Sequence, residues 1–193
     1  MDQPLGRAVG NALEIREALE TLRGEGPSDF TELVLDATAR LLALSDLGVD
    51  EAEGRSRAEA ALADDSALRT YERWIRAQGG DPDEDVLPTA AVVRPVPAGR
   101  DGYVAEVGAS AIGLAALRLG AGRAAKDDPI DHAVGIRCLR KRGDAVEAGV
   151  PLAEVHARDE ASAAMAVAEV AAAYRIEADA PDPRPLLIDV VRG

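Results

Sequence analysis

The chain has 193 residues, of which 47% are hydrophobic and only 3% aromatic, so any sizeable core must be built from Ala, Val, Leu and Ile. Its 35 Asp and Glu outnumber its 22 Lys and Arg, which gives a formal net charge of −13. This charge would repel a phosphate backbone, and we therefore expect no nucleic acid partner.

Cysteine content and hydropathy indicate where the protein works. Cys138 is the single cysteine, so no disulfide can form within the chain and nothing favours an oxidising compartment. Asp2 and Arg7 interrupt the start of the chain, which has no apolar run long enough for a signal peptide. No other stretch approaches the length of a membrane span. We therefore expect a cytoplasmic protein that has no membrane partner.

The first part of the chain is predicted to be helical. Apolar residues at helical spacing predict a first helix over residues 11–23, preceded by a loop. Ser28 is expected to cap a second helix, and Asp50 has capping-box spacing for a third. Apolar residues from Leu68 to Ile75 mark a fourth helix, which stops at Gly79.

A boundary is expected after these helices, where the acidic, proline-bearing residues 81–88 form a linker. Residues 1–86 hold 20 acidic and 9 basic residues, against 15 and 13 in residues 87–193. The two parts therefore differ electrostatically, and we expect two domains, a helical one over 1–86 and an α+β one over 87–193.

Beyond the linker the pattern changes to short strands with two helices. Strands are predicted over residues 91–96, 102–107, 133–139 and 151–156, with a last one near 186–191. A short helix is expected over 110–119 and a longer one from about 159 to 173.

Three stretches carry a family resemblance: MDQPLGRAVGNALEIREALETLRGEGP at the start, Ala77-Gln78-Gly79-Gly80-Asp81, and the run from Gly102 to Val155. In register and in order, they resemble the thymidine and pyrimidine-nucleoside phosphorylase family over nearly the whole chain. The resemblance implies an α/β to α+β fold, in which 1–86 is the helical remnant of a truncated central α/β phosphorylase domain. Residues 87–193 would form the C-terminal α+β domain. We therefore expect the chain to be the C-terminal portion of such an enzyme.

The resemblance implies reversible attack of inorganic phosphate on the sugar C1 of a pyrimidine nucleoside. This reaction releases the base and a pentose 1-phosphate, serves nucleoside salvage, and is carried out by a homodimer. In the family the catalytic histidine and the residues that hold the pyrimidine lie in upstream segments. The resemblance therefore assigns no catalytic residue and no organic cofactor to this chain, which is expected to be inactive alone.

Other readings of the chain stay open. It could be one chain of a split phosphorylase that is complemented by its upstream half. It could also be a non-enzymatic interaction module built on the same scaffold. AMP phosphorylases share that scaffold too, so the resemblance does not decide between a pyrimidine nucleoside and AMP as substrate.

The resemblance implies part of one binding site, a site for a monovalent cation. Family members bind a monovalent cation, potassium, through two main-chain carbonyls and a glutamate, which match Leu5, Ala8 and Glu17. Hard cations take oxygen ligands, and a loop just before a helix can turn carbonyls toward one point. The alternative is that Glu17, which projects away from the Ile15/Leu19 stripe, is an ordinary exposed helix residue. The remaining ligands belong to the upstream half, so the site is expected to be incomplete here.

Two other features are expected to be structural. The cluster Gly120-Ala121-Gly122-Arg123 follows a helix, whereas a phosphate cradle precedes one, so we expect a helix C-cap. The resemblance offers the alternative of a mobile lid over residues 120–131. His132 and His156 have no carboxylate or serine partner at a sequence spacing that would indicate a catalytic pair, so neither is assigned a catalytic role.

The run 141–152 has the pattern GDxVxxGxPL and resembles the half-barrel of lipoyl and biotinyl carrier domains. A carrier needs an acceptor lysine, whose place falls at Glu160, and the only lysines of the chain are Lys126 and Lys141. We therefore expect a barrel-sandwich-like strand unit that carries no prosthetic group.

Overall fold

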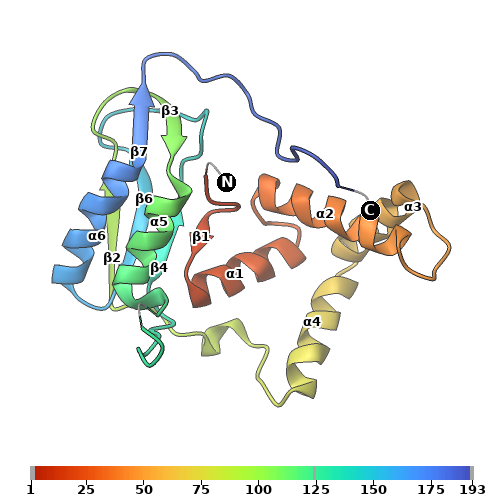
Figure 1. The fold of residues 1–193 in the computed structure, drawn as a ribbon. Helices are drawn as coiled ribbons and strands as arrows, with labels where there is room; N and C mark the ends of the chain where they lie inside the picture. Colours follow the sequence, from red (N-terminus) through yellow and green to blue (C-terminus); the bar gives the residue numbers. More distant parts are fainter. Residues whose placement is uncertain (1–2, 124, 192–193) are drawn as a thin grey trace. The chain divides into compact units, whose positions relative to one another are not determined.

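The computed structural model describes residues 3–123 and 125–191, and the chain divides into two compact units. The sheet unit comprises the chain up to Ile15 together with Leu87–Arg184. The helical unit comprises Arg16–Val86 and the residues from Pro185 onward. Figure 1 labels the elements of both units. No helix within the described ranges is long and apolar enough to cross a membrane.

The helical unit confirms the four predicted helices. Its elements are the greater part of α1 (Asn11–Leu22), followed by α2 (Ser28–Ala43), α3 (Glu51–Ala63), α4 (Ser66–Ala77) and the short 3-10 turn η1 (Glu84–Val86). Asp50 caps α3 as predicted, because its carboxylate accepts a hydrogen bond from the Glu53 amide at 2.8 Å. The prediction for Ser28 was wrong: Pro27 precedes α2 in the cap position, and no side chain caps that end.

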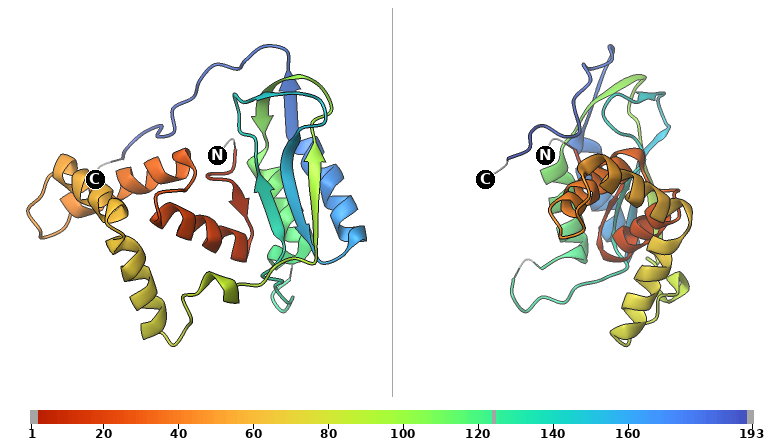
Figure 2. Two further views of the ribbon diagram at one scale, coloured as in Figure 1. Left: turned by 180° about the vertical axis from the view of Figure 1, so that it is seen from behind. Right: turned by 90° about the vertical axis from the view of Figure 1, so that its right-hand side faces the viewer.

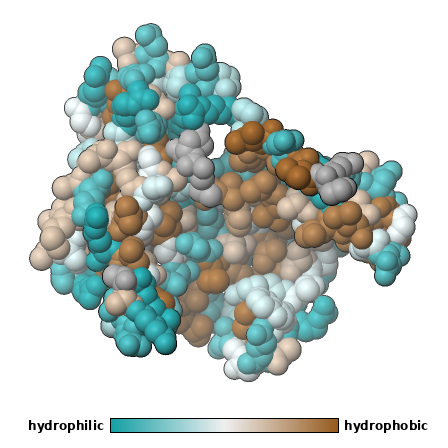
Figure 3. Space-filling model, in the orientation of Figure 1, coloured by the Kyte–Doolittle hydropathy of each residue, from teal (hydrophilic) through white to brown (hydrophobic). Residues whose placement is uncertain are grey.

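Helices α2 and α3 pack closely because a glycine lies between them. A Cβ atom on Gly54 would lie 2.7 Å from the carbonyl oxygen of Ala39, closer than real Cβ contacts allow. Both residues are buried, so the two helix backbones meet at this point. Several large apolar side chains of the unit nevertheless stay exposed: Leu41, Leu44, Leu47 and Trp74. Hydrophobic residues are accordingly visible over the region of α2 in Figure 3.

The sheet unit contains two antiparallel sheets and two helices, which makes it an α+β unit. The four-stranded sheet has the order β1 (Ala8–Val9), β4 (Gly135–Cys138), β6 (Pro151–Ala157) and β2 (Val92–Pro97). The three-stranded sheet has the order β5 (Ala145–Val146), β3 (Gly102–Val107) and β7 (Tyr174–Glu177). The helical elements are α5 (Ala109–Ala116), the wide turn η2 (Leu117–Ala121) and α6 (Glu160–Ala173).

The core of this unit lies between the sheets and the helices α5 and α6, which lie side by side in Figure 2. Strand β6 alternates, so that Val155 points into the core while Glu154 and His156 face the other way. Ile112 of α5 and Val170 of α6 are fully buried in the same core. Small residues dominate α6, and this allows the helix to approach the sheet closely without aromatic filling.

Two predictions for the chain ends were wrong. The segment before α1 was expected to be a loop, but it contains β1, which pairs with β4 through Ala8↔Arg137 and Val9↔Ile136. The expected strand near residues 186–191 does not form within the described residues, although its apolar residues suit a strand. Strand β3 is already flanked on both sides, by β5 and by β7, which directly follows α6. The division into domains 1–86 and 87–193 stays a prediction, to which the structure adds that β1 belongs to the sheet unit.

The β1–β4 pairing depends on two glycines that lie against each other. Gly10 has a φ of +138°, and a Cβ on it would lie 2.6 Å from the Val134 oxygen. A Cβ on Gly135 would lie 2.5 Å from the Val9 oxygen and 2.9 Å from Leu13 Cδ1. Backbone therefore packs on backbone where β1 turns into α1, and any side chain there would push the two apart.

We expect Gly135→Ala to lower the free energy of unfolding by about 1–3 kcal/mol, because the added methyl group overpacks a backbone contact. Gly113 in α5 is the matched control, since nothing lies within 4 Å of its Cβ position. Gly113→Ala should raise the stability by about 0.5–1 kcal/mol through helix propensity. Urea unfolding followed by circular dichroism measures both. Similar stabilities for the two variants would show that the close approach is not tight.

Candidate cation site

The segment from Gln3 to Gly10, which contains two of the three predicted cation ligands, is attached to β4 of the sheet unit. Besides the β1 pairing, the Cys138 amide donates to the Arg7 oxygen at 2.7 Å. Gly6 has a φ of +63°, a left-handed conformation that turns the chain just before the strand. The segment is therefore a fixed part of the sheet unit.

Leu5 and Ala8 both lie in this segment, on either side of the turn at Gly6. The Leu5 side chain is half-buried, and Ala8, in β1, is buried. The carbonyl oxygens of Pro4 and Gly6 both accept hydrogen bonds from the Lys141 ammonium group. The main chain around Leu5 is thus already arranged around one positive charge, which is the kind of group that carbonyl oxygens attract.

Glu17 lies in α1, in the part that belongs to the helical unit. Its residue surface is only 7% exposed, which contradicts the alternative of an exposed helix glutamate. Its main-chain oxygen accepts a hydrogen bond from Thr21 Oγ1 at 2.8 Å. Buried carboxylates are rare unless partnered or metal-bound, so the burial of Glu17 calls for a specific role.

Side chains alone do not build a metal site in the described part of the chain, because no three His, Cys, Asp or Glu residues gather there as ligands. A cation site in this chain would therefore depend on main-chain carbonyls, as the Leu5 and Ala8 assignment does. Such a site suits a hard monovalent or divalent cation that takes oxygen ligands.

The glycine cluster at 120–123 begins within η2 and follows α5, as predicted. Gly120 has a φ of +108°, and its carbonyl accepts from the Asp131 amide at 2.9 Å. The carbonyl of Ala121 accepts from Asn11 Nδ2 at 2.8 Å, and that of Leu119 accepts from Arg158 Nη2 at 2.7 Å. These carbonyls accept hydrogen bonds at the end of a helix, and the positive φ of Gly120 fits the predicted C-cap.

The two histidines occupy different environments. His132 is exposed, and its main-chain oxygen accepts from the Ala12 amide at 3.1 Å. His156 lies in β6 with its Nε2 atom buried, 4.0 Å from a Glu154 carboxylate oxygen. Burial lowers the pKa of His156 below its usual value; Glu154 opposes this shift, whereas the charge on Arg137 adds to it. His132 lies in the loop before β4, whereas His156 lies in β6 opposite Gly135.

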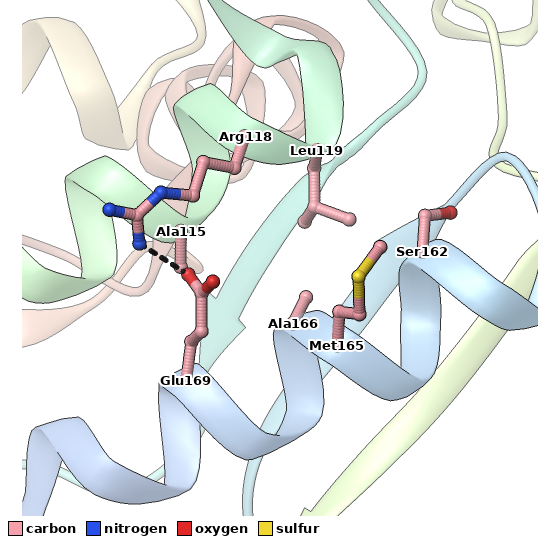
Figure 4. Close-up of a pocket in the computed structure, with 7 residues that line it drawn as sticks. All are labelled: Ala115, Arg118, Leu119, Ser162, Met165, Ala166 and Glu169. Carbon is pink, nitrogen blue, oxygen red and sulfur yellow. Dashed lines mark hydrogen bonds and ion pairs between the residues drawn. The ribbon is translucent and has the colours of Figure 1, made fainter.

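A small groove between α5 and α6, with a volume of about 150 Å³, was not predicted from the sequence. Its lining residues are Ala115, Arg118, Leu119, Ser162, Met165, Ala166 and Glu169 (Figure 4). Arg118 Nη1 and Glu169 Oε2 lie 2.9 Å apart across one end. Both side chains are substantially exposed, so this ion pair is a surface contact, and the groove offers no reactive group.

Comparisons with known proteins agree with the resemblance seen in the sequence. The family described as the pyrimidine nucleoside phosphorylase C-terminal domain matches residues 103–177. A pyrimidine-nucleoside phosphorylase of Geobacillus stearothermophilus is 45% identical over 164 residues, which cover 83% of this chain and 38% of that protein. One of Bacillus subtilis (strain 168) is 43% identical over 188 residues, 95% of this chain and 43% of that protein.

The sheet unit therefore contains a domain of phosphorylase type. The chain belongs to the pyrimidine-nucleoside phosphorylase family and corresponds to its C-terminal portion. It spans about two fifths of the length of the curated relatives it matches.

The depressed pKa of His156 makes stability depend on pH. An unfolded histidine titrates near pH 6.5, whereas folded His156 resists protonation, so the unfolded state binds more protons in mildly acidic solution. We expect the free energy of unfolding to fall as the pH drops from 7 to 5, by no more than about 1.4 kcal/mol per pH unit from this one group.

His156→Gln should flatten this pH dependence. Urea unfolding at several pH values measures the slope. If the variant kept the slope of the unmodified chain, His156 would not be the titrating group.

Proposed function

We propose that the chain supplies the C-terminal portion of a phosphorylase that cleaves pyrimidine nucleosides with inorganic phosphate. In that reaction a phosphate oxygen attacks the sugar C1, the bond to the base breaks, and a pentose 1-phosphate and the free base leave. The observation that carries the proposal is the 43% identity to a pyrimidine-nucleoside phosphorylase over 95% of this chain. The reaction belongs to nucleoside salvage in the cytoplasm, in line with the single, buried cysteine.

Within the complete enzyme this chain would provide scaffold and part of a potassium site, while the upstream half would provide the residues that hold phosphate and base and transfer protons. The exposed apolar residues of α2 and α4 support this division of labour. Exposed apolar patches of this kind mark surfaces that another segment covers. A homodimer, as in the family, is the expected assembly.

A second candidate function is that of one chain in a split phosphorylase, complemented by a separately encoded upstream half. The same exposed apolar surface favours it, because a separate chain could cover that surface equally well. AMP-phosphorylase-like substrates and a non-enzymatic interaction module are further alternatives, and activity measurements on the complemented protein separate them.

We also propose that the strands around the turn at 141–144 form the barrel-sandwich-like unit that the GDxVxxGxPL pattern suggests. Gly143 has a φ of +98°, as the tight Gly-Asp turn requires, and Val146 and Leu152 are buried. The position of a carrier lysine is held by Glu160, which is bound by Arg94 at 2.7 Å. This unit would therefore serve as scaffold and carry no prosthetic group.

The 193-residue chain alone is expected to show no phosphorolysis of thymidine or uridine. Each missing group for acid–base or electrostatic catalysis is typically worth a factor of about 10² or more, and the family places all of them upstream. An assay of thymidine with phosphate, against a mock preparation, tests this. Activity of the chain alone would contradict the proposal, and activity that returns on adding a separate upstream half would favour the split enzyme.

The potassium site is tested in the complemented enzyme through Glu17. We expect Glu17→Gln to raise the half-saturating potassium concentration by about tenfold, because a neutral amide replaces a charged ligand. Glu20→Gln is the matched control, one turn along the same helix, and should leave the potassium dependence unchanged. Equal effects from the two substitutions, or none from either, would remove Glu17 from the site.

A further inference from the structure

The turn between β4 and β5 provides a rigid base for two basic side chains. The Lys141 amide donates to the Asp144 carboxylate at 2.8 Å, and the Asp144 amide donates back to the Lys141 oxygen at 3.0 Å. The Gly143 amide bonds to the Val104 oxygen at 2.8 Å, which ties the turn to β3. The main chain at Lys141 is therefore fixed from both sides.

From this base the Lys141 ammonium donates to the carbonyl oxygens of Pro4 and Gly6. Carbonyls at positions i and i+2 that converge on one point form a small cradle for a cation, and here the cation belongs to the protein itself. An ammonium group has three donors, so one lysine can satisfy several carbonyls at once. The contact joins residues far apart in the sequence but within the same unit.

Two further bonds hold the same segment. The Arg142 amide donates to Gln3 Oε1 at 3.0 Å, and the Cys138 amide donates to the Arg7 oxygen at 2.7 Å. The Arg142 guanidinium donates to the Asp182 oxygen at 2.6 Å, near the C-terminal end of the unit's sequence. The segment before β1 is thus held at several points, and at one of them the partner is the charged side chain of Lys141.

We propose that Lys141 is a positioning residue for the cation site: its ammonium acts as an internal cation that fixes the main chain at Pro4 and Gly6, and thereby sets the direction of the Leu5 carbonyl. The inference rests on the proposed potassium site at Leu5, Ala8 and Glu17. Peptide units are planar, so holding the carbonyls before and after Leu5 leaves its own carbonyl little freedom. Lys141 binds the carbonyls of Pro4 and Gly6, which the proposed site does not use.

The two lysines of the chain allow a direct test on the unmodified protein. Lys126 is exposed, whereas Lys141 is half-buried and hydrogen-bonded. Acetylation with a water-soluble reagent, followed by mass spectrometry, should modify Lys141 about tenfold or more slowly than Lys126. Equal rates at the two lysines would overturn the proposed contact.

Hydrogen exchange of the segment 5–9 tests the positioning role itself. Lys141→Met should raise its exchange rate by about tenfold, while Lys141→Arg, which keeps a charge and several donors, should stay within about threefold of the unmodified chain. Lys126→Met is the matched control and should change nothing. Exchange in β3 and α6 shows whether each variant is folded. An unchanged segment 5–9 in Lys141→Met, or an equal increase throughout the sheet unit, would overturn the positioning role.

Potassium titrations in the complemented enzyme separate this inference from the site on which it rests. Lys141→Met should raise the half-saturating potassium concentration several-fold and leave kcat at saturating potassium unchanged, which a general loss of folding would not do. If Glu17→Gln has no effect on potassium dependence, the cation site itself fails. If Glu17→Gln has its effect and Lys141→Met has none, the site stands and the positioning role of Lys141 is refuted.

Discussion

The contact on which the sheet unit depends is the backbone approach between β1 and β4. Gly10 and Gly135 face each other there without side chains, so the carbonyls of Val9 and Val134 come closer than any Cβ would allow. The approach lets a strand of two residues add to the four-stranded sheet, and it places the first turn of α1 directly after that strand. Glu14 then closes the helix start, because its carboxylate accepts from the Gly10 amide at 2.8 Å.

This arrangement connects the sheet unit to the proposed cation ligands. The carbonyls of Leu5 and Ala8 belong to a segment whose position is set by β4 and by the turn after it. The domain that matches the phosphorylase family over residues 103–177 would therefore have a role beyond that of a scaffold. It holds the segment from which the proposed cation would be bound, and this would give the sheet unit a role in the proposed site.

The sequence predicted most of the regular elements, and the failures have a common cause. The capping-box spacing at Asp50 located α3, and the helical pattern from about residue 159 to 173 located α6, since both signals are local. Strand β1 was missed because two residues are too few to show alternation, and its partner β4 lies more than a hundred residues away. Residues 186–191 are mostly apolar and suit a strand in composition, but a strand also needs a partner strand along a sheet edge, and no local pattern reveals that partner.

The candidate site, like the fold, was predicted only in part from local sequence patterns. Leu5, Ala8 and Glu17 were reached only through family resemblance, since carbonyl ligands leave no mark on residue type. Periodicity placed Glu17 away from the apolar stripe of α1, yet it lies buried, so a helix wheel alone gives the wrong surroundings for it. Lys141 was read as part of a turn, because its partners are main-chain oxygens that any sequence would supply. The rarity of lysine in this chain could have drawn attention to Lys141. Of the 22 basic residues only two are lysines, and one of them lies in a tight turn between strands.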